Sequence, residues 1–135
     1  MQAPTVTSGY LAVLALIYAA LGLRVALLRR KNLVLFGDSG NTDLRSAIRA
    51  HAHFAEYVPI TVLMVAMLEM SGLAALRVHL LMAALLVARL LHPLGMYAKP
   101  MTPQFVVGRI GGMTLTILVM IASAVQILLR LWRGS

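Results

Sequence analysis

Long apolar stretches separated by short polar connections run along the whole 135-residue chain. About 20 apolar residues make a helix long enough to cross the hydrocarbon core of a bilayer. The pattern predicts an all-α fold, a four-helix transmembrane bundle, in a single membrane domain that covers residues 1–135. We place the four spans at approximately 9–28, 46–70, 74–94 and 105–131.

Turn-forming residues and prolines mark the connections between these spans. Residues 37–42 read G-D-S-G-N-T and predict a loop, after which Thr42 or Asp43 is the expected N-cap of the second helix. Pro59 falls inside that helix, and because a proline removes one backbone hydrogen bond we expect a bend near Ala55. The connection to the fourth helix is expected to be marked by Pro93, Gly95, Pro100 and Pro103.

The composition agrees with a membrane protein. The chain is 61% hydrophobic and only 12% charged, with a mean hydropathy of +0.89, far from the values of a soluble domain. Cysteine is absent, so no disulfide, thiolate nucleophile or cysteine metal site is available. The start of the chain lacks the basic segment and cleavage site of a signal peptide, so we expect the first apolar run to remain as a membrane helix.

The charge distribution favours a lipid bilayer over nucleic acid as the partner. The formal net charge is +8, but the cations flank apolar spans and do not alternate with aromatic residues. Positive charges concentrate in the 29–45 and 95–104 connections, and such loops usually lie in the cytoplasm. We therefore expect an integral membrane protein with both termini outside and these two connections cytoplasmic.

The stretch from Arg49 to Pro59, R-A-H-A-H-F-A-E-Y-V-P, carries the candidate chemistry. Arg49, His53 and Glu56 are spaced i, i+4 and i+7, so all three project from one face of a helix. An ionised carboxylate inside a membrane needs a cation or a set of donors, and residues of this kind usually face the bundle interior or a functional cavity.

Three further polar residues are expected at the same depth as this stretch. Arg89 and His92 lie one turn apart near the end of the third span, and Arg109 lies near the start of the fourth. Arg89 could form an ion pair with Glu56, bind a ligand anion, or do both. Because cations outnumber acids here, the expected ligand is an anion.

Structural roles compete with these functional ones. Arg49 could extend its guanidinium to lipid headgroups, His53 and Glu56 could form a purely structural pair, and Glu69 is expected to be solvated. No metal site is expected, because His51 and His53 face about 160° apart on a helix and cannot chelate together.

These residues resemble a motif of the MAPEG family, the membrane-associated proteins in eicosanoid and glutathione metabolism. The motif R-A-x-x-x-x-x-E-Y-x-P begins at Arg49 and ends at Pro59, and the A-R-L segment at 88–90 also fits. The family commonly has asparagine where this chain has His53. The G-D-S-G-N segment at 37–41 is most similar to bacterial members, which implies a bacterial inner membrane.

The resemblance implies a homotrimer that binds glutathione between neighbouring subunits near the cytoplasmic face. Arg109 is the best match for the catalytic arginine that stabilises the glutathione thiolate. The positions that correspond to glutathione contacts, or to residues beside them, are Arg30, Arg49, His51, His53, Glu56, Tyr57, Arg89, His92 and Tyr97.

The expected function is glutathione-dependent detoxification, either a transferase acting on lipophilic electrophiles or a peroxidase acting on lipid hydroperoxides. One alternative is a non-catalytic protein that keeps the scaffold and binds another anion or a lipid. A small multidrug exporter is a further alternative, but the carboxylate that such a protein needs in its first helix is absent from residues 9–28.

Overall fold

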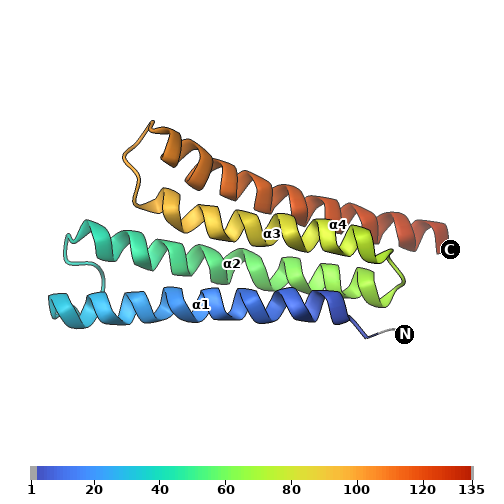
Figure 1. The fold of residues 1–135 in the computed structure, drawn as a ribbon, viewed down its shortest axis with the longest axis horizontal. Coiled ribbons are helices and arrows are strands. Elements are labelled where there is room, and N and C mark those ends of the chain that lie inside the picture. The colour runs from blue at the N-terminus through green and yellow to red at the C-terminus, as the bar shows by residue number, and fades with distance from the viewer. Residues whose placement is uncertain (1–2, 135) are drawn as a thin grey trace.

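The structure, a computed structural model, describes residues 3–134. Its four long helices lie side by side, and each runs in the opposite direction to the one before it (Figure 1). The helices are α1 (Thr5–Asn32), α2 (Thr42–Met70), α3 (Ala75–Met96) and α4 (Gly112–Gly134), and a π-helix, η1 (Phe105–Gly111), leads directly into α4. Each of α1, α2, α3 and the continuous η1–α4 segment is long and apolar enough to cross a membrane. The predicted all-α fold with four spans is confirmed.

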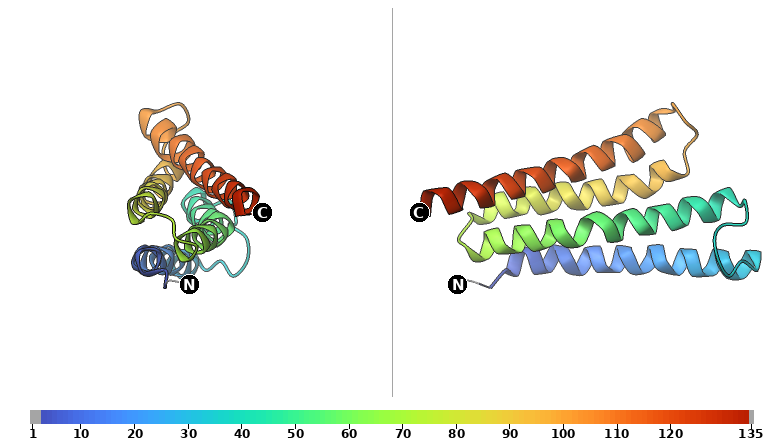
Figure 2. Two further views of the ribbon diagram at one scale, coloured as in Figure 1. Left: turned by 90° about the vertical axis from the view of Figure 1, so that its right-hand side faces the viewer. Right: turned by 180° about the vertical axis from the view of Figure 1, so that it is seen from behind.

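Both termini lie at one end of the bundle, and the connections 33–41 and 97–104 lie at the other (Figures 1 and 2). We call the latter the connection end. Helix α2 contacts all three other helices, whereas α1 and α4 make no contact with each other among the described residues. The α3 and α4 pair leans away from α1 and α2 towards the connection end (Figure 1).

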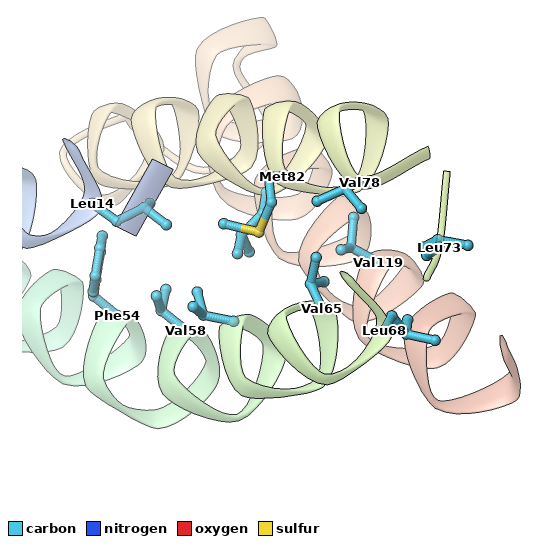
Figure 3. Packing of buried hydrophobic residues seen from close by; sticks show 11 residues of the cluster. Leu14, Phe54, Val58, Val65, Leu68, Leu73, Val78, Met82 and Val119 are labelled. Atoms are coloured by element: carbon cyan, nitrogen blue, oxygen red, sulfur yellow. The ribbon is translucent and has the colours of Figure 1, made fainter. Parts of the chain in front are cut away.

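The hydrophobic core lies where α2 and α3 face each other, with contributions from α1 and α4. Val58 and Val65 of α2 point towards Val78 and Met82 of α3, and Leu68 lies further along α2, near Leu73 (Figure 3). The same cluster includes Leu14, Phe54, Val62, Leu73, Leu85 and Val119. Lipid tails are as apolar as these side chains, so in a membrane it is van der Waals packing in this cluster that holds the helices together.

Glu69 is buried, which corrects the expectation that it is solvated. Its carboxylate accepts hydrogen bonds from the backbone N–H groups of Val6 and Thr7, both at 2.8 Å, and from the Thr7 hydroxyl at 2.6 Å. The first N–H groups of a helix have no partner within the helix, and an anion there also interacts favourably with the helix dipole. Glu69 therefore caps α1 from the end of α2.

The 33–41 connection is held by polar side chains at both of its ends. Asn41 is the N-cap of α2, because its side-chain oxygen accepts the Leu44 N–H at 2.9 Å. The predicted caps, Thr42 and Asp43, already lie inside the helix, so that expectation is wrong by one or two residues. The Arg45 guanidinium donates to Asp38 and holds the pKa of that carboxyl below its usual range.

Helix α3 continues through Pro93 and Gly95 to Met96, although both residues were expected in a connection. The close packing of this last turn against η1 explains the difference, since neighbouring helices allow prolines inside membrane helices. A Cβ at Gly108 would lie only 2.6 Å from the Gly95 nitrogen, and a Cβ at Gly95 would overlap the backbone of Arg109. Glycine at both positions is required for this approach. Helix α2 likewise continues through Pro59.

The buried cap makes a prediction about stability. Glu69→Ala removes three hydrogen bonds and leaves the Thr7 hydroxyl buried without that acceptor, so we expect a loss of about 2 kcal/mol. Thermal unfolding of the purified protein in detergent measures this loss as a lower midpoint. Asp43→Ala is the matched control, because Asp43 is an exposed carboxylate near the start of the same helix. Equal midpoints for the two variants would contradict the capping role.

Candidate functional site

Two histidines on neighbouring helices form a hydrogen bond near the connection end. His53 Nδ1 on α2 lies 2.9 Å from His92 Nε2 on α3. The other ring nitrogen of His92, Nδ1, lies 3.3 Å from the backbone carbonyl oxygen of Arg109 in η1. His92 is 2% exposed and His53 is half-buried. One polar chain thus joins α2, α3 and η1.

The glycines of η1 and α4 explain how His92 reaches the Arg109 carbonyl. Besides the Gly95–Gly108 contact, Gly112 packs so closely on α3 that a Cβ there would lie 3.1 Å from the His92 Cβ. Helices approach most closely where small residues face each other. The π-helical turn of η1 falls at this contact, and such turns are frequent at functional sites.

A pocket of about 290 Å³ lies beside the histidine pair. The Arg109 guanidinium carbon is 5.4 Å from the centre of the Phe105 ring, and the rings of Tyr57 and His53 meet edge to face with centroids 6.5 Å apart. The pocket is lined by His53, His92, Phe105, Arg109, Ile110 and Met113. It combines an imidazole, a guanidinium and apolar walls, a set that can accept a proton and stabilise an adjacent anion.

Arg89 is fully enclosed in the bundle, with only 1% of its surface exposed. Its Nη2 donates to the Gly112 carbonyl oxygen at 3.3 Å and to the Thr116 hydroxyl, both in α4. Glu56 is not its partner, so of the two roles left open by the sequence, the ion pair is not formed. In this structure the Arg89 side chain fastens the start of α4 to α3.

The other charged residues of the predicted site lie on the surface. Arg49 and Glu56 are exposed on α2, on the helix face that also carries His53, and Arg109 is exposed on η1. The only ion pair within residues 3–134 joins Arg45 and Asp38, so Glu56 has no cationic partner there. The structure therefore leaves one carboxylate and two guanidinium groups open to a ligand or a neighbouring subunit.

The remaining predicted residues lie on the α1 side or at its end. The His51 ring stacks on Tyr18 of α1, with ring centroids 4.5 Å apart, and so is separated from the histidine pair. The Arg24 guanidinium carbon lies 4.4 Å from the centre of the Tyr97 ring, and burial raises the pKa of the Tyr97 phenol. Arg30 is exposed near the end of α1.

Sequence reasoning missed two of the residues that organise this site and one contact between residues that it had named. It did not foresee that Thr116 accepts from Arg89, that Arg24 covers Tyr97, or that the two histidines contact each other. One signal was available: the glycines at 108, 111 and 112, set against Gly95, indicate a close approach of two backbones.

Comparison with known proteins identifies the family. The MAPEG family model matches residues 7–129, nearly the whole chain. The chain belongs to the MAPEG family. It is also 34% identical over 94 residues to the inner membrane protein YecN of Escherichia coli K12, an alignment that covers 70% of this chain and 72% of the relative. YecN of the E. coli O6:H1 strain CFT073 matches equally well, and no solved structure gives a significant match.

These relatives and the four apolar helices identify an integral protein of the bacterial inner membrane, as the sequence predicted. The side of the membrane on which each connection lies stays a prediction. The family match agrees with the resemblance that the sequence analysis found in the second-helix motif.

The Arg89 contact makes a second prediction about stability. Thr116→Val keeps the shape of the side chain but removes a buried acceptor of the guanidinium, so we expect a loss of about 1–3 kcal/mol. A lowered thermal midpoint in detergent measures it. Thr114→Val is the matched control, since Thr114 lies on the same turn and is exposed. If both variants unfold at the same temperature, Arg89 does not depend on Thr116.

Proposed function

We propose that this protein is a glutathione-dependent membrane enzyme that transfers the glutathione sulfur to lipophilic electrophiles or reduces lipid hydroperoxides. The observation that carries the proposal is the exposed Arg49 and Glu56 pair on the same face of α2 as His53, which lines the pocket shared with Arg109. Glutathione offers two carboxylates, one amino group and a thiol, and these groups of the protein are complementary to them.

The exposed face of α2 requires a cover inside the membrane, which supports a homotrimer. If α2 enters the hydrocarbon near Ala50, Glu56 lies about 9 Å deeper, at 1.5 Å per residue. An ionised carboxylate facing lipid at that depth costs at least a few kcal/mol. A neighbouring subunit, with ligand bound in the interface, removes this cost. The trimer implied by the family resemblance is one such arrangement, and we adopt it as part of the proposal.

Each group of the ligand has a proposed partner in this arrangement. Glu56 binds the ligand's amino group, and Arg49 binds a carboxylate through charge-assisted hydrogen bonds. Arg109 stabilises the thiolate, which is the reactive form of the sulfur. His51, Tyr57, Tyr97 and Arg30 border the site or meet it across the subunit boundary. Arg89 does not contact the ligand in this proposal; it holds α4, and thereby η1, in place.

The lipophilic co-substrate is proposed to enter sideways from the bilayer. Helix α1 exposes large apolar side chains such as Leu16 and Leu23, at 72% and 60%. Within one subunit α1 and α4 do not touch among the described residues, so the surfaces of both are open to lipid or to a neighbouring copy. An apolar molecule dissolved in the membrane could therefore reach the site between α1 and α4 of adjacent subunits.

The alternative is a non-catalytic family member that binds another anion or a lipid. The enclosure of Arg89 favours it, since that guanidinium is bonded to α4 and is not presented at the surface. His53, which stands where the family commonly has asparagine, also favours it. A measurement of glutathione binding distinguishes the two functions, because the non-catalytic alternative requires no affinity for glutathione.

The first test of the proposal is calorimetric titration of glutathione into the detergent-purified protein. We expect Glu56→Gln and Arg49→Ala each to weaken binding by about 10- to 100-fold, since each removes a charge-assisted hydrogen bond worth roughly 1.5–3 kcal/mol. Arg77→Ala, an exposed arginine at the opposite end of the bundle, serves as the control. Absence of binding to the unaltered protein at millimolar glutathione would end the proposal and favour the alternative.

The role of Arg109 is tested by turnover. Arg109→Ala removes the cation beside the sulfur, so we expect kcat with an activated aryl chloride to fall by about 100-fold. Glutathione affinity should change much less, because Arg49 and Glu56 remain. Arg109→Lys keeps the charge and should recover part of the rate. Unchanged kcat in Arg109→Ala would remove this residue from the mechanism.

A further inference from the structure

We propose that His53 is the proton acceptor for the ligand thiol. The hydrogen bonds made by His92 keep Nε2 of His53 unprotonated, so that this nitrogen can take the proton. The inference rests on the proposed function and assigns the proton transfer that precedes thiolate formation. It is carried by the chain from His53 through His92 to the Arg109 carbonyl.

The carbonyl oxygen at the end of this chain determines where the protons lie. A carbonyl oxygen only accepts hydrogen bonds, so His92 Nδ1 carries the proton that it donates to Arg109. A neutral imidazole has one N–H, which leaves a lone pair on His92 Nε2. That lone pair, at 2.9 Å, accepts the Nδ1–H of His53. His53 in its neutral form then has its lone pair on Nε2.

The opposite tautomers do not fit the geometry. If His92 Nε2 donated to His53, Nδ1 of the neutral His92 ring would hold a lone pair facing the Arg109 oxygen at 3.3 Å, and the two would repel. Buried charges in proteins are normally paired, and no carboxylate contacts His92 among the described residues. The neutral ring with its proton on Nδ1 is therefore the form that satisfies this site.

The second ring nitrogen of His53, Nε2, has no hydrogen-bond partner among the described residues. His53 is half-buried and lines the pocket beside Arg109. The charged groups that act on the ring are Arg49 and Glu56 on α2, Arg89 on α3 and Arg109 on η1, and His92 is its titratable neighbour. These groups and His92 are the ones that face the ring from every element packed against it.

The proton transfer balances without any further reagent. The S–H bond of glutathione breaks, its proton forms the Nε2–H bond of His53, and the thiolate remains beside the Arg109 guanidinium. With an activated aryl chloride, the sulfur forms a bond to the ring carbon and chloride leaves with the electrons of the C–Cl bond. His53 then releases the proton to water at the connection end. Histidine is the side chain that most often serves as a general base in enzymes.

The test compares the unaltered protein with His53→Asn, His53→Gln, His92→Leu and His92→Gln. Glutathione affinity is measured by calorimetry, the bound thiolate by its ultraviolet absorbance against pH, and kcat with an activated aryl chloride against pH. His79→Asn is the control, because His79 is an exposed histidine at the far end of α3. Thermal midpoints identify any variant that fails to fold, and the two His53 variants back each other up.

Support takes the following form. Both His53 variants keep glutathione affinity within about threefold but lose about 100-fold in kcat, the usual contribution of a general base. Thiolate then appears only at higher pH than in the unaltered protein. His92→Leu shifts the pH profile in the same direction, and His92→Gln restores it, because the amide both accepts and donates a hydrogen bond.

Three results overturn the inference. A His53 variant that folds, binds glutathione and keeps the original kcat and pH profile shows that His53 is not the base. A His92→Leu profile identical to the original shows that His92 does not position it. If the unaltered protein neither binds nor turns over glutathione, the proposed function fails and this inference fails with it, and that result is distinct from the other two.

Discussion

The close approach of two backbones, at Gly95 of α3 and Gly108 of η1, is the constraint on which the connection end of the molecule depends. A side chain at either position would overlap the opposite backbone. Because the two segments touch there, His92 reaches the carbonyl oxygen of Arg109 and the Arg89 guanidinium reaches Gly112. Neither bond could form at the distance that larger residues impose, so the glycines place the polar groups of the site although they carry no chemistry themselves.

The polar residues of the chain divide into two kinds, and the division connects the fold to the proposed function. Glu69 and Arg89 are buried and bonded to other helices, and they stabilise the bundle as it stands. Arg49, Glu56 and Arg109 are exposed and have no ion-pair partner within residues 3–134. A membrane protein has little tolerance for unpaired charge, and the second kind marks the surface where the proposed function places glutathione and a neighbouring subunit.

The number of helices and their order could be predicted from the sequence because hydropathy over a 20-residue window is a strong signal. The details that failed depend on contacts between helices. Glu69 looks solvated until α1 is placed beside it, and Pro93 looks like a helix end until η1 packs against the last turn of α3. The similar depth of His53 and His92 could be predicted from their positions in the spans, but their contact depends on the relative rotation of α2 and α3, which no local pattern contains.

The π-helical turn of η1 sets the rotation of everything that follows it. One residue changes the direction of a helical side chain by about 100°, so a gain or loss of one residue between Gly108 and Thr116 would turn all of α4 by that angle. Thr116 would leave Arg89, and Val119 would leave the core. The segment is therefore a point of length sensitivity in the chain. A variant of this chain with one residue more or one fewer there would present another face of its fourth helix to its surroundings.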